Sequence, residues 1–132
     1  MGSKRADASF GKAQRLLNAK DYSEVFDGTE AKASHKRLLL LAKRNYTSGH
    51  RLGLVIARKN VRLAVERNRI KRVAREFFRT LKEEEPGMDV VLLARHGMDQ
   101  LDNAELSSIL RQQWQVLGRR IPKTERNSSQ DS

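Results

Sequence analysis

The sequence of 132 residues contains no cysteine, and this absence excludes several classes of site. Without thiols the chain has no disulfide framework, no thiolate nucleophile and no cysteine metal site. Long apolar runs are also missing, since no stretch approaches the roughly 20 residues that a bilayer-spanning helix needs. The N-terminal segment lacks the hydrophobic region of a signal peptide. We therefore expect a soluble, cytoplasmic protein.

The sequence also lacks the residue clusters of a protein nuclease. Its three histidines, His35, His50 and His96, lie in separate segments and do not show the HxxxH or HExxH spacing of a metal site. Asp89 and Asp102 have no neighbouring carboxylate in such a pattern. Protein nucleases use clustered carboxylates to hold metal ions, or pairs of histidines for acid–base catalysis. The sequence predicts no catalytic residue and no metal-ligating residue.

Positive charge is what the chain has in excess. It carries 27 Lys and Arg against 16 Asp and Glu, a net charge of +11. Such an excess is typical of a nucleic-acid-binding protein or, as an alternative, of a membrane-surface protein. The length and the hydrophobic content of 38% suit one domain with a modest core.

The stretch from Arg58 to Arg79 combines this charge with helical periodicity. One face of the expected helix is apolar and consists of Ile70, Val73, Ala74, Phe77, Phe78 and Leu81. The opposite face carries Asn68, Arg72, Arg75 and Arg79, with Lys71 at its edge and Arg67 and Arg69 flanking the apolar stripe. Within the stretch only Glu66 and Glu76 oppose these cations. An ordinary solvated face remains an alternative, but the density of cations on one side favours a polyanion partner.

The residue types in this stretch suit RNA better than a membrane. Guanidinium groups bind phosphates through paired hydrogen bonds, and the amide of Asn68 both donates and accepts. An amphipathic helix lying on an anionic membrane is the weaker interpretation, because a small domain needs Phe77 and Phe78 in its core. We therefore expect this helix to bind a folded RNA.

A longer motif surrounds these cations and carries a family resemblance. It reads Ala64-Val65-x-Arg67-Asn68-Arg69-Ile70-Lys71-Arg72-x-x-Arg75-Glu76-x-Phe78-Arg79 and follows a Leu-Gly-Leu-Val strand. The motif resembles the signature of the bacterial ribonuclease P protein component. That resemblance implies the protein subunit of an endoribonuclease, which binds a large catalytic RNA and helps it remove the 5′ leader of precursor tRNA. The RNA would hold the Mg2+ ions and carry the catalytic centre, and the protein would be monomeric within the ribonucleoprotein.

The resemblance divides the candidate residues between two RNA partners. Those expected to face the catalytic RNA are Arg67, Asn68, Arg69, Lys71, Arg72 and Arg75. Those expected to face the precursor leader are Tyr22, Phe26, Arg58, Lys59 and His35, with Lys36 and Arg37 as an extension. From sequence alone, the i,i+4 pair Tyr22 and Phe26 fits a core position as well as a platform for stacked bases; the resemblance favours the platform.

Two positions depart from the family pattern. Tyr22 stands where Phe is common, and Val61-Arg62-Leu63 replaces a Gly often found before Ala-Val. The first change keeps an aromatic surface, and the second alters the linker before the helix. A non-catalytic RNA-binding module, such as a ribosomal protein or an RNA chaperone, explains the charge equally well but not the length of the motif.

The remaining periodicity predicts a single α+β domain, an α/β sandwich in the order α-β-β-β-α-β-α. Asn18 to Gly28 reads as a helix closed by a C′ glycine, and Asp102 with Glu105 as a capping box that opens a last helix ending at Gly118. Strands are expected at Leu38–Ala42, Leu52–Ala57 and Asp89–Ala94, with an ambiguous one within Thr29–Ser34. The resemblance implies a left-handed β-α-β crossover. We expect a domain at 10–118 between flexible segments at 1–9 and 119–132.

Overall fold

The computed structural model describes residue 15 and residues 19–45, 49–81 and 87–121. The elements follow the predicted order, and the ambiguous segment is a strand. They are α2 (Ala19–Asp27), β1 (Ala31–His35), β2 (Leu38–Arg44), β3 (Arg51–Val55), α3 (Ala64–Arg79), β4 (Met88–Ala94), the short 3-10 helix η2 (Met98–Gln100) and α4 (Asn103–Arg120). The prediction of one α+β domain in this order is confirmed.

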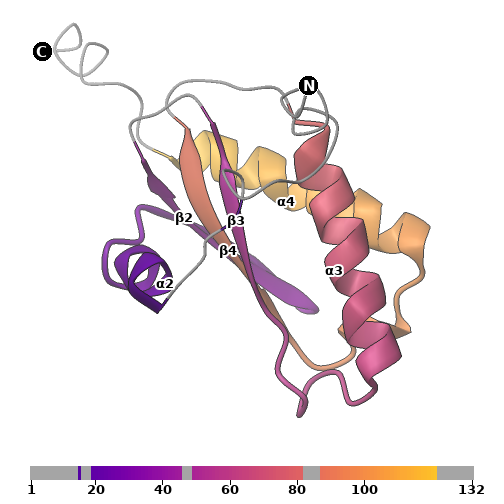
Figure 1. The fold of residues 1–132 in the computed structure, drawn as a ribbon. Coiled ribbons are helices and arrows are strands. Elements are labelled where there is room, and N and C mark those ends of the chain that lie inside the picture. Colours follow the sequence, from indigo (N-terminus) through magenta and orange to yellow (C-terminus); the bar gives the residue numbers. More distant parts are fainter. Residues whose placement is uncertain (1–14, 16–18, 46–48, 82–86, 122–132) are drawn as a thin grey trace, which may run out of the picture.

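The four strands form one mixed sheet in the order β1-β2-β4-β3. The pairs β1–β2 and β2–β4 are antiparallel, and β3 pairs with β4 in parallel. Helix α3 connects the parallel pair. In Figure 1 both strands run downward, β3 lies in front of β4 and α3 lies to their right, so the connection is left-handed. Most β-α-β connections are right-handed.

The two faces of the sheet are covered unequally. Helices α3 and α4 lie on one face, where α4 contacts β1 and β2, and the much shorter α2 lies on the other (Figure 1). Alternate residues of the strands therefore enter different clusters: Leu40 and Leu92 pack under α3 and α4, whereas Leu41 and Val91 pack with Val25 of α2. Among the described residues, no helix is long and apolar enough to cross a membrane.

Helix α4 begins as predicted but ends later. The Asp102 carboxylate accepts a hydrogen bond from Glu105 N, and the Glu105 side chain accepts one from Asp102 N, which confirms the capping box. The prediction that Gly118 ends the helix is wrong, because the apolar face continues: Leu117 and Ile121 are both buried. Residues 119–121 of the flexible segment expected at 119–132 thus belong to α4 and its C-cap, and the remainder of that segment and the one expected at 1–9 lie outside the described residues.

The C′ role predicted for Gly28 is also wrong. Among the described glycines only Gly97 has a positive φ, at 88°. Helix α2 ends instead with ordinary backbone, since Gly28 N donates to Glu24 O at 3.0 Å and the Thr29 hydroxyl donates to Val25 O at 2.6 Å. The side chain of Thr29 thus satisfies a carbonyl that a left-handed glycine would otherwise help to cap.

Candidate RNA-binding surfaces

The solvent-facing side of α3 carries a compact set of motif residues. Asn68 and Arg72 are exposed and Lys71 is half-buried. Within the described part of the chain, none of these three side chains takes part in a hydrogen bond or ion pair. Leu63 and Val65, with exposed fractions of 54% and 68%, lie beside them at the start of the helix. This side of α3 can therefore contact phosphates and bases without first breaking an internal interaction.

Arg67 lies at the start of the same helix but is already engaged. Its guanidinium donates to Val61 O at 3.0 Å and to Arg62 O at 2.8 Å. Val61 is fully buried, so these bonds hold the segment that follows β3 against the first turn of α3. The segment that departs from the family pattern, Val61-Arg62-Leu63, is thus fixed by a residue of the motif itself.

Arg69 is engaged still further, although the sequence placed it among the RNA-facing cations. It forms an ion pair with Glu66 at 2.8 Å and donates to the Asn103 side-chain oxygen at 2.8 Å. It also donates to Asp99 O at 3.2 Å and Leu101 O at 2.8 Å. These bonds join α3 to the segment that leads into α4. The i,i+3 spacing from Glu66 was a sequence signal for the ion pair, but the other partners depend on tertiary structure.

Arg69→Ala is expected to lower mainly the stability of the protein, and Arg72→Ala mainly its affinity for RNA. Arg69→Ala should lower the free energy of unfolding by about 2 kcal/mol, because it removes several hydrogen bonds made by a charged group. Arg72→Ala should leave stability unchanged but weaken binding to the catalytic RNA and reduce the slope of log affinity against log salt by about 0.7–0.9. Urea denaturation and binding titrations at several salt concentrations separate the two. Equal stability losses in both variants would contradict this division.

Arg75 of α3 is half-buried, unlike the exposed Arg72. Burial lowers the pKa of Arg75, and the nearby cation Arg15 lowers it further, while Tyr22 acts in the opposite direction. The backbone of Arg15 forms an isolated parallel β-bridge with Leu52 of β3. Arg75 therefore interacts electrostatically both with Arg15 and with Tyr22 of α2.

The aromatic pair on α2 divides into an anchored ring and an open one. Tyr22 is half-buried, and its hydroxyl accepts a hydrogen bond from Leu54 N at 3.2 Å, while Val25 of the same helix is buried against the sheet. Phe26 has an exposed fraction of 43%. The two alternatives for this pair therefore apply to different residues: Tyr22 packs on the sheet, and the ring of Phe26 is largely accessible.

Beyond α2, the same face of the sheet stays partly open and apolar. Leu39, Val55 and Leu93 come from three adjacent strands and are only partly buried. Because α2 is short and contacts only β2 and β4 among the strands to a substantial extent, it leaves these side chains incompletely covered. This apolar strip, with the half-buried ring of Tyr22 packed against the same cluster, provides a surface on which unpaired bases can stack.

Cations collect where this strip ends. Arg58 and Lys59 are exposed just after β3, and His35 ends β1. Strand pairing places these chain segments at one end of the sheet, together with Arg95 after β4. Arg95 was not among the predicted site residues; like Arg58, it follows directly on the apolar residues of a strand, which was the available signal. It donates to His35 O at 2.8 Å and Ser34 Oγ at 3.0 Å.

His35 and Arg37 also have structural partners at this end of the sheet. His35 Nδ1 accepts a hydrogen bond from Arg37 N at 3.0 Å. Burial lowers the pKa of His35, and the neighbouring cations Lys36, Arg37 and Arg95 lower it further. The Arg37 guanidinium donates to His96 O at 3.1 Å. The neutral imidazole is thus favoured, so the positive charge here comes from the arginines and lysines.

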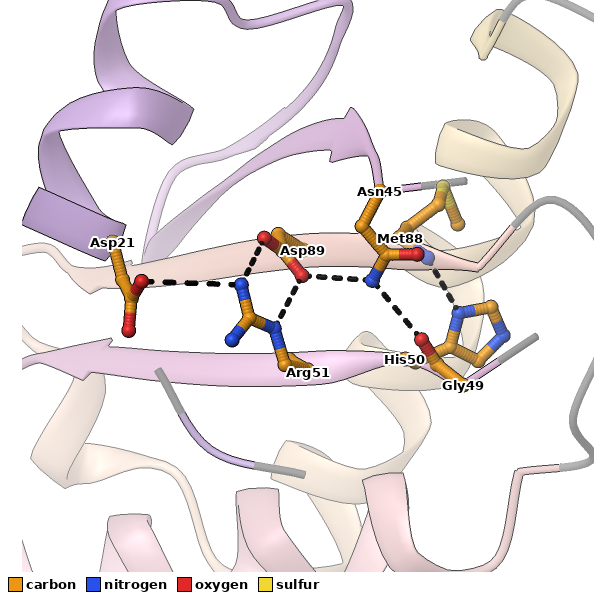
Figure 2. A network of polar contacts seen from close by, with 7 residues as sticks. All are labelled: Asp21, Asn45, Gly49, His50, Arg51, Met88 and Asp89. Atoms are coloured by element: carbon orange, nitrogen blue, oxygen red, sulfur yellow. Dashed lines mark hydrogen bonds and ion pairs between the residues drawn. The ribbon is translucent and has the colours of Figure 1, made fainter. Parts of the chain in front are cut away.

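A polar network at the opposite end of the sheet holds α2 in place, as Figure 2 shows. Asp89 of β4 is buried, and its two carboxylate oxygens accept hydrogen bonds from Arg51 at 2.9 and 2.7 Å. Asn45 donates to the same carboxylate at 2.8 Å, and Arg51 extends to Asp21 of α2 at 4.0 Å. Asp21 directly precedes Tyr22, so the network fixes the helix that carries the aromatic residues.

Asp89 is charged despite its burial. Burial by itself raises the pKa of this carboxyl, but the hydrogen bonds from Arg51 and Asn45 outweigh it and leave the pKa below its usual value. In the sequence, Asp89 has no neighbouring carboxylate, and no spacing pattern indicates a partner for it. The register shows Arg51 directly opposite Asp89 on the neighbouring strand, which a sequence without strand pairing could not reveal.

The titratable residues do not gather into a metal site within the described ranges. No group of three or more His, Asp or Glu residues there could hold a metal ion. His50, like His35, has a structural role, since its Nδ1 accepts a hydrogen bond from Met88 N at 3.1 Å and its ring meets Trp114 edge-on. The described surfaces therefore provide cations, apolar strips and amides, which are groups that bind RNA.

Comparison with known proteins identifies the family. The family model of ribonuclease P matches residues 10–118. The ribonuclease P protein component of Pseudomonas aeruginosa PAO1 is 47% identical over 88% of this chain and 86% of its own length. That of Marinobacter nauticus is 44% identical over 93% of this chain and 89% of its own length.

Solved structures agree in fold. The ribonuclease P protein of Staphylococcus aureus superimposes with a TM-score of 0.71 at 23% identity, over 80% of this chain and 99% of that one. The protein from Thermotoga maritima gives a TM-score of 0.64 at 25% identity, over 80% and 96% of the two chains. Together with the sequence matches, they show that this chain belongs to the family of bacterial ribonuclease P protein components, the protein subunits of the ribonuclease P endoribonuclease.

Proposed function

We propose that this ribonuclease P subunit binds its two RNA partners on different faces. The catalytic RNA contacts the solvent-facing side of α3, where Asn68, Lys71 and Arg72 are available. The single-stranded 5′ leader of precursor tRNA crosses the partly open face of the sheet. The observation that carries the second assignment is the accessible ring of Phe26 on α2, together with the face of the sheet that α2 leaves partly open at Leu39, Val55 and Leu93.

The chemistry of the sheet face supports the leader as its ligand. Proteins bind single-stranded nucleic acids by stacking bases on aromatic rings within a groove whose cations follow the backbone. Here Phe26 supplies the ring, and Arg58 and Lys59 supply charge at the far end. Arg75, which the resemblance assigns to the catalytic RNA, is reassigned to the leader because it interacts electrostatically with Tyr22 of α2. Mature tRNA has no leader, so contacts on this face favour the precursor over the product.

The division of labour follows from the same residues. The protein reduces the repulsion between two polyanions and positions the leader, while the Mg2+ ions and the catalytic centre belong to the RNA subunit. A single copy of the protein carries both surfaces, which suits a monomeric subunit acting on RNA in the cytoplasm. The residues expected to act in this way bind and position RNA, and none is assigned a catalytic step.

Phe26→Ala is expected to weaken binding of precursor tRNA to the holoenzyme about tenfold, while mature tRNA binds almost unchanged. One base stacked on an aromatic ring is worth about 1–3 kcal/mol, and about 1.4 kcal/mol is a factor of ten. Affinities for both RNAs are measured with the reconstituted holoenzyme.

Two matched variants show whether the ring is responsible. Phe26→Tyr keeps an aromatic face and should bind precursor like the wild type, whereas Phe26→Leu keeps apolar bulk and should resemble Phe26→Ala. A thermal melt checks folding, since a core Phe replaced by Ala costs about 3–5 kcal/mol. If Phe26→Ala unfolds the protein, or reduces both affinities equally, Phe26 is a core residue and the leader assignment fails.

A further inference from the structure

A groove runs between α3 and α4 on the helical side of the domain, away from the sheet face described above. It has a volume of about 420 Å3, within the range of small-molecule sites. Helix α4 contributes Asn103, Ser107 and Arg111, which are spaced four residues apart and lie on one stripe. The half-buried Val73 and Phe77 of α3 supply its apolar lining.

The polar groups around this apolar lining have the character of a nucleotide site. Exposed guanidinium groups stand on both sides, Arg72 from α3 and Arg111 from α4. Glu76 also lines the groove, but it is paired with Arg79, so the local charge favours an anion. Two arginines beside an apolar lining match the phosphates and the base of a nucleotide.

The motif residue Arg69 fixes one further feature of the groove. Its guanidinium donates to the side-chain oxygen of Asn103 at 2.8 Å. An amide whose oxygen is already occupied presents its NH2 group for donation. Asn103 therefore offers oriented donors to a base, and Ser107 offers a hydroxyl that donates or accepts.

The position of the groove selects between the two RNA partners. Arg72 belongs both to the groove and to the exposed side of α3 assigned to the catalytic RNA. The sheet separates the groove from Phe26, because α2 lies on one face and α3 and α4 on the other (Figure 1). A leader held against Phe26 would have to pass around the sheet to reach the groove.

We propose that the groove between α3 and α4 binds a nucleobase that projects from an unpaired position of the catalytic RNA, with Arg72 and Arg111 on its flanking phosphates. The inference rests on the proposed function, because it assumes that the exposed side of α3 faces this RNA. It assigns Asn103, Ser107 and Arg111 of α4, which lie outside the motif, to RNA binding. Arg69 then acts as a positioning residue for Asn103.

The chain contains no cysteine, so one thiol introduced in the groove can be modified selectively. The Ser107→Cys variant is purified in its folded state, and its RNA binding is compared before and after alkylation with N-ethylmaleimide. The attached maleimide group fills the groove of a protein that has already folded. Ser108→Cys is the matched control, since Ser108 is the exposed neighbour and does not line the groove. The RNA is the cognate ribonuclease P RNA, probed with dimethyl sulfate and by binding titration.

Alkylation of Ser107→Cys should lower affinity for this RNA about tenfold, and alkylation of Ser108→Cys should change it less than twofold. One unpaired nucleotide, or two adjacent ones, should be protected by unmodified Ser107→Cys and become reactive after alkylation. The same footprint before and after alkylation, equal effects at both positions, or a thiol at 107 that does not react would overturn the proposal. A change in protection of the precursor leader instead would also overturn it.

Arg111→Ala provides a second test, with Arg119→Ala as its control. Both arginines are exposed on α4, but only Arg111 lines the groove. Arg111→Ala should reduce the salt slope of RNA binding by about 0.7–0.9 and expose the same nucleotide, whereas Arg119→Ala should not. If the two variants behave alike, the groove is not a binding site. If the wild-type protein fails to bind the RNA at all, the proposed function itself fails, which is a separate result.

Discussion

Precursor tRNA incubated with the purified, RNA-free protein is expected to remain intact, and addition of the cognate catalytic RNA at low magnesium is expected to produce cleavage at the 5′ end. The difference in rate should be very large, since enzymes accelerate reactions by roughly a million-fold or more. Three of the titratable side chains that the structure describes have structural partners. His35 and His50 accept backbone hydrogen bonds, and the Asp89 carboxylate is held by Arg51 and Asn45.

The measurement is a cleavage assay with end-labelled precursor, which resolves leader and mature tRNA. The protein is first treated with an immobilised ribonuclease and re-purified, so that no copurified RNA contributes. In the assay with added catalytic RNA, Arg72→Ala serves as a control for contamination. Its weaker binding to this RNA should reduce cleavage by the holoenzyme but not cleavage by a contaminating nuclease. Magnesium-dependent cleavage that follows the RNA-free protein through successive columns would contradict the division of labour.

The order of elements and the face of α3 could be read from the sequence because each depends on local periodicity. The buried residues Ile70, Ala74 and Phe78 lie on the expected stripe, and Arg72 lies on the expected solvent side. The capping box of α4 was equally local, since both of its residues lie within one turn. Such patterns are determined by spacing along the chain, which a sequence displays directly.

The roles of the cations could not be read in the same way, because they depend on what another element brings close. Arg67 and Arg69 have the same residue type as Arg72, but the carbonyls of Val61 and Leu101 approach only the first two. A helical wheel ranks residues by angle and carries no information about these partners. Likewise, nothing in the sequence indicated that Ser107 of α4 would line a groove with Phe77 of α3.

Asp89→Asn is expected to lower the free energy of unfolding by about 3 kcal/mol. Removing one member of a buried ion pair leaves its partner without compensation, which costs about 3–5 kcal/mol, and the lower end applies because Arg51 is about one-third exposed. The value is obtained from urea denaturation near neutral pH. Glu76→Gln is the control: it breaks an ion pair at the surface of α3 and should leave stability unchanged.

The pH dependence of this difference identifies the charge of Asp89 as its cause. The folded protein holds the pKa of Asp89 below its usual value, so the stabilisation is complete above the unfolded pKa of about 4 and is lost as pH falls through the lower folded pKa. The difference in unfolding free energy between the wild type and Asp89→Asn should therefore narrow below about pH 4, where only the wild type gains a proton at this site.

Because Arg51 also reaches Asp21, α2 should loosen as well, and amide exchange within Ala19–Asp27 should accelerate in Asp89→Asn. A gap that stays constant down to acid pH, or unchanged exchange in α2, would show that Asp89 contributes packing alone and does not fix the helix that carries Phe26.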